Sequence, residues 1–459
     1  METVRGEAST QVEVAREVDA PAASAFPSSA HAAPPSLLVV TLRRWLSLPE
    51  VRAALIATAL LRLAGGIVVA LVCYFLNGTY FHVVQLTQHI QSQDNSGAIY
   101  AGPTPGSPFI EYLTDAWIRW DAGHYLAIAH DGYFYPVSTA YLPLYPLLIR
   151  LLSYPLGGHF VAAALVISTC ATFCTFLLLY RLILRLTASR QVAAYSVVVA
   201  ALLPIAFFLV APYTESLYLA ISLATVLAVL DRHWGRAMLL AGLASLTRQQ
   251  GVVLALLAVP ALCDAIRGAR SGALPGWQRV HHFWLAAWRP LAFAATSLGT
   301  YVAWLLVVRF VLRAPTPYEQ VTSSSAWGQH LTLPGVGLIH DVLFLAQDPG
   351  FQLLYDHALM LDLAAALLAL IGLLVARRRL PPALLLYLIG CWCVAIIKVE
   401  PNGTTMSAAR YLLVLLPLCM VPAAWLARAL PFVRLSYVFG SVLLGCMILS
   451  EWVLWLWVS

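Results

Sequence analysis

Charged residues are scarce in this sequence: Asp, Glu, Lys and Arg together make up 10% of its 459 residues, whereas apolar residues make up 61%. A soluble globular domain carries about 25% charged residues, so the composition excludes an ordinary soluble protein. The apolar residues gather in runs of roughly 20, the helix length needed to cross about 30 Å of hydrocarbon. The chain is therefore predicted to be an all-α polytopic membrane protein with about eleven transmembrane helices.

The sequence also lacks the signals of several cofactor sites. It contains no glycine-rich phosphate loop of the Walker or dinucleotide-binding type. Its eight cysteines all lie inside apolar runs, where cysteine behaves as a small hydrophobic residue, so no disulfide framework is indicated. No cofactor and no metal are predicted, although Asp115 and Asp121 are close enough in the sequence to leave a metal ion open.

The first part of the chain lacks an apolar run. Residues 1–36 are rich in Ala, Pro, Ser and Glu, without the apolar core that follows a basic start in a signal peptide. Such a composition is typical of disordered segments. We expect a disordered cytoplasmic tail over residues 1–48 and a transmembrane domain over residues 49–459.

Basic residues predict the orientation of the spans, because Lys and Arg concentrate in cytoplasmic loops. If the N-terminus lies inside, every inside loop is rich in arginine, and eleven crossings place the C-terminus outside. Two outside loops, 77–158 and 313–357, are long. The run 236–249 is short for a crossing and is compatible with a half-helix. The predicted spans are 52–76, 159–180, 191–211, 214–231, 236–249, 250–267, 290–312, 358–376, 382–399, 410–427 and 435–457.

The first outer loop carries a group of residues suited to chemistry. Asp115 and Asp121 lie six residues apart, Trp120 precedes the second acid, and His124 follows it. A carboxylate just outside the membrane can act as a general base or bind a cation. The alternative is a solvated loop with a belt of interfacial tryptophans.

A second acid, Glu215, begins or lies within a predicted span, directly after Tyr213 and Thr214. Charged residues at membrane depth are costly, so they tend to be functional or paired. The alternative is a helix N-terminal acid favoured by the helix dipole, with Thr214 as the N-cap.

The few basic residues predicted outside need a reason, because they depart from the positive-inside bias. Arginine suits bidentate phosphate binding, which would explain Arg248 and Arg410. Arg248 could instead pair with Glu215, and Arg410, which opens a span beside Tyr411, could snorkel at the interface. The outside basic residues are Arg119, Arg248, Arg313, Lys398 and Arg410.

At these residues the chain resembles the PIG-V-type mannosyltransferases, membrane glycosyltransferases of the GT-C class. The resemblance spans roughly residues 110–420 and implies a polyprenyl- or dolichyl-phosphate sugar donor, transfer outside the cytoplasm, and inversion at the anomeric carbon. Family members often carry Phe-Phe-Pro where this chain has Tyr141-Leu142-Pro143, which leaves substrate contacts there open. The motifs, in order, are Trp120-Asp121, Leu142-Pro-Leu-Tyr-Pro146, Pro212-Tyr-Thr-Glu-Ser216, Thr247-Arg-x-x-Gly251 and Arg410-Tyr411.

The resemblance implies roles for particular residues. Asp121 would be the catalytic acid/base residue, Glu215 a second catalytic acid, and Arg248 and Arg410 the residues that bind the donor phosphate. The expected partners are the lipid-linked sugar, a lipid or glycan acceptor and membrane lipids, with no nucleic acid. We expect a bacterial cytoplasmic membrane with the active site on the outer side. The predicted substrate-binding residues are Asp115, Trp120, His124, Tyr145, Tyr213, Arg248, Lys398, Arg410 and Tyr411.

Two other functions fit the same topology. A transporter or flippase for a lipid-linked sugar would also need many spans and intramembrane charges, although inverted repeats, common in transporters, are not evident. A non-catalytic scaffold would explain the spans but not the outside arginines.

Overall fold

The structure is a computed structural model of the chain, and it describes residues 44–75, 108–134, 136–270, 275–323, 327–347, 353–454, 456 and 458. The chain divides into two units, 1–46 and 47–459. Nearly all of the expected tail over 1–48, and residues 77–107 of the first outer loop, lie outside the described residues. The fold and the site concern the unit 47–459.

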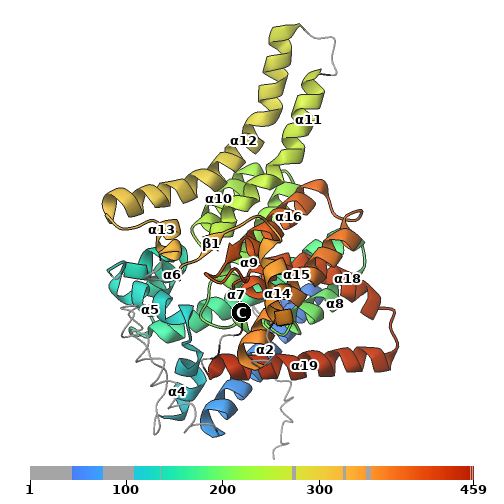
Figure 1. Ribbon diagram of the computed structural model, residues 1–459. Coiled ribbons are helices and arrows are strands. Elements are labelled where there is room, and N and C mark those ends of the chain that lie inside the picture. Colours follow the sequence, from blue (N-terminus) through green and yellow to red (C-terminus); the bar gives the residue numbers. More distant parts are fainter. Residues whose placement is uncertain are drawn as a thin grey trace, which may run out of the picture. The chain divides into compact units, whose positions relative to one another are not determined.

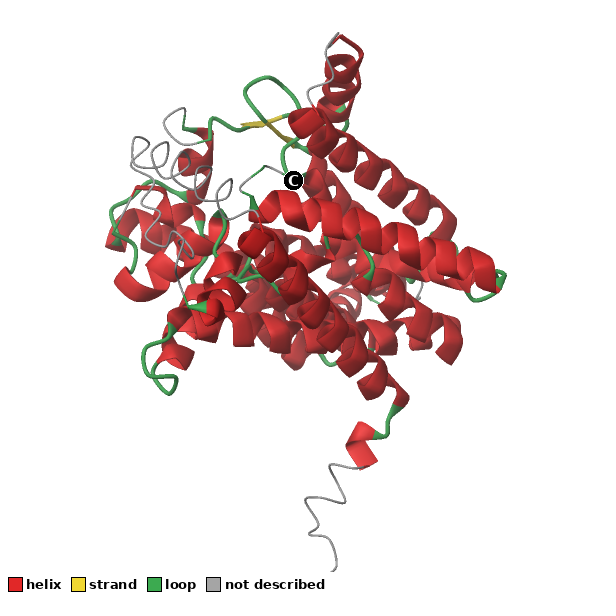
Figure 2. Cartoon of the chain, turned by 90° about the horizontal axis from the view of Figure 1, so that it is seen from below, coloured by secondary structure: helices red, strands yellow, loops and turns green. Residues whose placement is uncertain are grey.

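Helices dominate this unit, as Figures 1 and 2 show. Helices suit a chain in lipid, because they satisfy the backbone hydrogen bonds within one segment. The all-α polytopic class is thus confirmed. The elements are α2 (Pro49–Phe75), α4 (Phe109–Thr114), η1 (Asp115–Trp117), α5 (Asp121–Asp131), η2 (Pro136–Ala140), α6 (Leu144–Ser153), α7 (Phe160–Thr187), α8 (Arg190–Ala201), η3 (Ala206–Leu209), α9 (Glu215–Leu230), α10 (Trp234–Ser245), η4 (Gln249–Ala258), α11 (Val259–Arg270), α12 (Gly276–Leu306), η5 (Val307–Val311), α13 (Pro317–Thr322), β1 (His330–Leu331), α14 (Val336–Gln347), α15 (Leu353–Ala376), α16 (Pro382–Ile396), β2 (Lys398–Val399), α17 (Ala408–Leu412), η6 (Leu413–Cys419), α18 (Met420–Leu426) and α19 (Pro431–Val453).

Seven helical segments of the described residues are long and apolar enough to cross a membrane, so the count of eleven crossings is not confirmed. The four other predicted spans coincide with the shorter helices α8, α9, α10 and α16, of 12, 16, 12 and 15 residues. The seven long segments are Pro49–Phe75, Phe160–Thr187, Gln249–Arg270, Gly276–Val311, His357–Ala376, Ala408–Leu426 and Pro431–Val453.

The predicted span 191–211 is broken in the structure. Helix α8 ends at Ala201, and the backbone leaves the regular helix around Pro204, since proline has no N–H to donate and clashes with the preceding turn. The carbonyls exposed by this break find partners inside the protein. Thr172 donates to Leu209 O at 2.5 Å, and Arg62 donates through Nη1 to Val210 O at 2.7 Å. Arg62 is a cation inside a predicted span that sequence reasoning missed.

The short run 236–249 forms α10, whose 12 residues extend about 18 Å and cannot cross the hydrocarbon alone. The chain then turns into η4, which begins at Gln249, and Gly251 lies in its first turn. A Cβ atom on Gly251 would lie 2.4 Å from Ser245 Cα, so only glycine allows this approach. Ser297 of α12 also donates to Gly251 O at 2.8 Å, which fixes the turn against a third helix.

Two contacts join segments of this unit that lie far apart in the sequence. The antiparallel pair β1–β2, with His330 opposite Val399, joins the second long outer loop to the loop after α16. On another side, the buried Trp452 of α19 packs beside the rings of Trp117 and Tyr213, with centroids 5.9 and 6.1 Å away. The residues from α4–α5 and from the start of α9 are therefore held together.

Candidate active site

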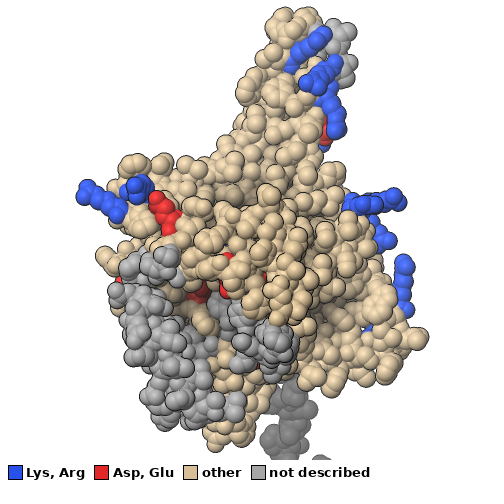
Figure 3. All heavy atoms as spheres, viewed as in Figure 1, with Lys and Arg blue, Asp and Glu red and all other residues tan. Residues whose placement is uncertain are grey.

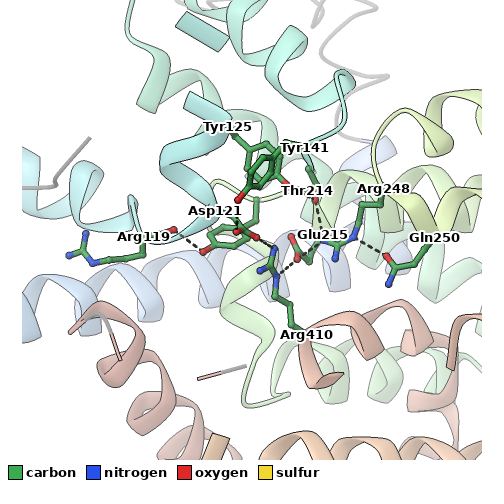
Figure 4. Close-up of polar contacts among 10 residues, drawn as sticks. Arg119, Asp121, Tyr125, Tyr141, Thr214, Glu215, Arg248, Gln250 and Arg410 are labelled. Carbon is green, nitrogen blue, oxygen red and sulfur yellow. Dashed lines mark hydrogen bonds and ion pairs between the residues drawn. The ribbon is translucent and has the colours of Figure 1, made fainter. Parts of the chain in front are cut away.

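Four charged side chains from four separate elements form one chain of ion pairs (Figure 4). Arg410 Nη2 lies 2.6 Å from Asp121 Oδ2, and Arg410 Nε lies 2.5 Å from Glu215 Oε1. Arg248 Nη1 lies 2.5 Å from the same Glu215 oxygen. We name Asp121, Glu215, Arg248 and Arg410 the charged cluster. It contains two carboxylates and two guanidinium groups, so its formal charges balance.

Solvent access differs sharply within the charged cluster. The side chains of Glu215, Arg248 and Arg410 are 2%, 9% and 7% exposed, whereas that of Asp121 is 27% exposed. Removing one partner of a buried ion pair is costly, because the other charge remains without compensation. Glu215 therefore holds the two arginines together inside the protein, and Asp121 is the carboxylate that a ligand can reach.

The environment of Asp121 keeps its carboxylate ionised. Burial acts to raise the pKa of Asp121, but the charge and hydrogen bond of Arg410 outweigh burial and hold this pKa below its usual value. The hydroxyl of Tyr141 donates to Asp121 Oδ1 at 3.0 Å and acts in the same direction. Tyr141 belongs to the stretch where the chain departs from the family pattern, and it contacts the predicted catalytic acid directly.

His124 lies one turn after Asp121 on α5 and stacks on Tyr141, with ring centroids 4.8 Å apart. Burial lowers the pKa of His124 to about 4, although the neighbouring charge of Asp121 opposes this effect. The imidazole is therefore neutral at pH 7. Its position supports the prediction that it lies beside the site.

Glu215 begins α9 and Thr214 occupies its N-cap position, as the alternative of a helix N-terminal acid predicted. The Thr214 side chain, however, makes no capping hydrogen bond. Its hydroxyl instead accepts from Arg248 Nη1 at 3.1 Å and lies 3.2 Å from the Tyr125 hydroxyl. The alternative that Arg248 pairs with Glu215 is confirmed by their contact.

One terminal nitrogen of Arg248, which carries two N–H donors, is left to offer. Its Nε donates to Gln250 Oε1 at 2.9 Å, and its Nη1 is shared between Thr214 and Glu215. Among the described residues, none accepts a hydrogen bond from its other terminal nitrogen, Nη2. A cavity of about 10 Å³, room for about one water, adjoins these groups. It is lined by Glu215, Tyr218, Leu219, Arg248, Gln250, Arg410, Tyr411, Leu413 and Val414.

The position of Arg410 is fixed by a buried acid that sequence reasoning missed. Asp362 of α15 accepts from the backbone N–H of Ala408 at 2.9 Å and of Ala409 at 2.8 Å, at the start of α17. Arg410 lies on the first turn of this helix and is buried, so the alternative of interfacial snorkelling is wrong. The missed signal was a lone aspartate inside a predicted span.

Aromatic rings surround the two arginines. The guanidinium of Arg410 lies 4.5 Å from the Tyr213 ring centroid, and that of Arg248 lies 5.2 Å from the Tyr411 centroid. Lys398 Nζ lies 4.8 Å from the same Tyr411 ring, which brings a third cation to the edge of the site. The structure thus gathers these predicted residues from positions far apart in the sequence.

Three predicted residues occupy different positions around this centre. Trp120, directly before Asp121, has φ of 50° and ψ of −121°, a backbone conformation that non-glycine residues rarely adopt. Tyr145 lies behind Tyr125, with its hydroxyl 2.8 Å from Ser168 Oγ. Asp115 accepts from the Thr114 hydroxyl at 2.8 Å and makes no ion pair with any described residue. The structure therefore does not join Asp115 to the charged cluster.

Metal-ligating side chains do not gather here. Within the part of the chain that the structure describes, no group of three or more His, Cys, Asp and Glu side chains could hold a metal ion. The geometry instead offers an accessible carboxylate beside two buried guanidinium groups.

Residues 67–266 match the family described as Mannosyltransferase (PIG-V). The resemblance to PIG-V-type mannosyltransferases is confirmed. The chain is also similar to GPI mannosyltransferase 2 of Schizosaccharomyces pombe, with 26% identity over 193 residues. That alignment covers 39% of this chain and 41% of the relative, so the chain spans about two fifths of the curated relative it matches.

The PIG-V match includes three members of the charged cluster: Asp121, Glu215 and Arg248. Arg410 lies beyond the matched residues, yet it bonds to both acids. The fold therefore completes, from the C-terminal part of the chain, a cluster that begins in the matched segment.

Two solved structures of oligosaccharyltransferases from one archaeon also match this chain, both with low TM-scores. An oligosaccharyltransferase from Archaeoglobus fulgidus, in complex with zinc and sulfate, matches with a TM-score of 0.35 and 13% identity. That match covers 75% of this chain and 49% of the other. The oligosaccharyltransferase AglB of the same organism, in complex with an inhibitory peptide and a dolichol-phosphate, matches with a TM-score of 0.37 and 12% identity. It covers 81% of this chain and 56% of the other. TM-scores this low support no conclusion about fold or activity.

Proposed function

We propose that this protein is an inverting membrane glycosyltransferase that moves a sugar, expected to be mannose, from a polyprenyl-phosphate donor to a hydroxyl of a lipid or glycan acceptor. The observation that carries the proposal is the position of Asp121. Its carboxylate is the accessible member of a charged cluster that is otherwise buried, and it lies in the segment matching the mannosyltransferase family.

The reaction would be a single displacement with Asp121 as general base. Asp121 takes the proton of the acceptor hydroxyl while that oxygen attacks the sugar C1. The new C1–O bond forms on the face opposite the phosphate, the old C1–O bond breaks, and polyprenyl phosphate leaves with the bonding electrons. Proton transfer of this kind contributes typically about 10²- to 10⁴-fold to a rate.

The two arginines would stabilise the leaving phosphate, since charge develops there in the transition state. The cavity beside Arg248 has room for about one water, so a phosphate group does not fit without movement. Donor binding would therefore separate Arg410 from one of its two carboxylates. If Asp121 is the one released, its pKa rises toward the ordinary value, which makes it a stronger base at the moment the donor is bound.

The charge distribution of the sequence supports one side of the membrane for the proposed site. Asp121, Arg248 and Arg410 all lie in segments predicted to face outward, and the basic loops are predicted to face the cytoplasm. We therefore propose an extracytoplasmic active site. A donor carried by a membrane lipid would be presented at that surface without a nucleotide-binding pocket.

The test is sugar transfer by the purified protein in detergent, with a radiolabelled polyprenyl-phosphate sugar and a pool of lipid and glycan acceptors. Asp121→Asn keeps the side-chain shape but cannot take a proton, so transfer should fall by at least about 10²-fold. Asp131→Asn is the matched control, because Asp131 is an exposed acid at the end of the same helix, and it should leave transfer unchanged.

Near-normal transfer by Asp121→Asn would overturn the assignment of the base. The same assay separates transfer from transport of a lipid-linked sugar. Detergent micelles have no two sides between which a lipid could be moved, so a flippase would leave the labelled donor chemically unchanged.

A further inference from the structure

Helix α11 and the first half of α12 form a hairpin that projects from the rest of the unit (Figure 1). The continuous helical segment Gly276–Val311 has 36 residues, about 54 Å at 1.5 Å per residue. The hydrocarbon is only about 30 Å thick, so one crossing cannot accommodate the whole segment. The predicted span, 290–312, uses only its second half.

Pro290 marks the junction between the two halves. Proline inside a helix removes a backbone hydrogen bond and bends the axis. Figure 1 shows the first half of α12 leaving in a different direction from the second half. The first half of α12 therefore extends beyond the predicted span, and its axis differs in direction from that of the second half.

One face of this extension is apolar and exposed. Trp277, Val280, Trp284 and Trp288 are 72%, 57%, 54% and 49% exposed. Their spacing of three and four residues places them on one stripe of the helix. The same spacing continues beyond the bend to the exposed residues Leu298, Val302 and Leu306 of the spanning half. The stripe is thus in register with the side of α12 that meets lipid.

Basic side chains accompany the stripe. Asp264 is the one acid of the hairpin among the described residues, and it pairs with Arg267 at 3.1 Å. The space-filling view shows basic side chains at the tip of the projection (Figure 3). The hairpin's basic and potentially basic residues are Arg267, Arg270, Arg279, His281, His282 and Arg289.

We propose that this hairpin lies in the membrane–water interface and binds the anionic headgroups of phospholipids. Tryptophan prefers the headgroup level, where its ring is apolar and its N–H is wet. Guanidinium groups bind phosphate in a bidentate manner. Each basic residue near the surface raises the affinity for anionic lipid about fivefold. A soluble protein partner would not account for a stripe that continues into the lipid-facing side of the same helix. This inference is independent of the proposed catalytic activity.

The experiment uses the full chain in nanodiscs that contain equal amounts of phosphatidylglycerol and phosphatidylcholine. A photo-reactive p-benzoylphenylalanine replaces Val280, and a second variant carries it at Val302 as the matched control. The two positions are 22 residues and about 33 Å apart along one stripe. Position 280 should cross-link phosphatidylglycerol at least about fivefold more than phosphatidylcholine, whereas position 302 should show little preference.

The arginines provide the second arm of the test. Arg279→Gln combined with Arg289→Gln should remove the preference at position 280 and leave cross-linking at position 302 unchanged. Cross-linking at position 280 to protein or to no lipid would overturn the proposal. A preference for phosphatidylglycerol that survives the double substitution would also overturn it, because the recognition would then not involve these cations.

Discussion

At the scale of single residues, Glu215 is distinguished by the number of charges that depend on it. One of its oxygens contacts both Arg248 and Arg410, and its side chain is almost fully buried. A catalytic acid must be accessible to substrate, and the Glu215 carboxylate is less exposed than that of Asp121. Its role as a catalytic residue stays a prediction, and its role in holding the arginines has a direct structural basis.

This arrangement predicts non-additive effects on stability. Glu215→Gln should lower the free energy of unfolding by about 3–5 kcal/mol, because two buried guanidinium groups lose their shared counter-ion. Combining it with Arg248→Met restores the charge balance, so the double variant should be less destabilised than the sum of the single variants. Thermal unfolding of the four proteins in detergent measures this coupling. Additive losses would mean that the ion pair makes no net contribution.

A second prediction at this scale concerns His124 and pH. Burial lowers its pKa to about 4, below the value of about 6.5 in an unfolded chain. Between these pH values the unfolded chain binds a proton that the folded protein does not, so folding stability falls as the pH decreases from 6.5 to 4. Asp121, whose pKa is lowered, contributes a further loss only below its unfolded pKa of about 4.

His124→Phe keeps a flat ring against Tyr141 but does not titrate. The difference in melting temperature between pH 7 and pH 4.5 should therefore be smaller in this variant than in the unaltered protein. The measurement is thermal unfolding at both pH values in the same detergent. An equal or larger difference in the variant would show that His124 is not the group that titrates.

Sequence reasoning could find several site residues and suggest the pair of Arg248 and Glu215, but it could not find the contacts of Arg410. Arg248 and Arg410 stand out because outer arginines break the positive-inside pattern, and Asp121 stands out through its motif. Glu215 pairs with both arginines, and Arg410 lies 195 positions from it in the sequence, a contact that spacing cannot reveal. Asp362 was not predicted as a site residue, because its carboxylate accepts hydrogen bonds from backbone N–H groups of another helix and belongs to no motif.

At the scale of elements, prolines and glycines decide where predicted spans are interrupted. Hydropathy predicts one span over 191–211, but the helix stops at Ala201 because the local backbone chemistry overrides apolar composition. The break is stable because Thr172 and Arg62 donate to the exposed carbonyls. Such partners depend on tertiary packing, which is why a hydropathy pattern misses the interruption.

Gly251 allows the close turn between α10 and η4 and therefore predicts a strong effect of a single methyl group. Gly251→Ala places a Cβ within 2.4 Å of Ser245 Cα, so the turn must open at a cost of about 1–3 kcal/mol or more. The matched change Gly235→Ala, on α10, meets nothing within 4 Å and should be neutral or stabilising.

The two alanine variants are compared by thermal unfolding and by the yield of folded protein. Because Arg248 lies between α10 and η4, Gly251→Ala should also disturb the charged cluster and lower activity, whereas Gly235→Ala should not. Equal stability of the two variants would contradict the importance of this close approach.

At the scale of the whole molecule, the proposed chemistry depends on the orientation in the membrane that the charge pattern predicts. The basic loop after α15 holds Arg377, Arg378 and Arg379, whereas the loop after α16 leads to Arg410 and the charged cluster. Between them lies α16, whose 15 residues extend only about 22 Å. The proposed outward position of the charged cluster therefore depends on whether this short helix crosses the membrane.

A reporter inserted on each side of α16 in the full chain tests this orientation. Alkaline phosphatase is active only outside the cytoplasm, so insertion after Asn402 should give activity and insertion after Arg378 should not. The physical reason is that three adjacent arginines favour retention on the cytoplasmic side, and a helix of about 22 Å can span where the bilayer thins locally or the neighbouring helices cover its ends. Activity at both positions or at neither would show that α16 does not cross. The reverse pattern would place the charged cluster on the cytoplasmic face and would exclude an extracytoplasmic transfer reaction.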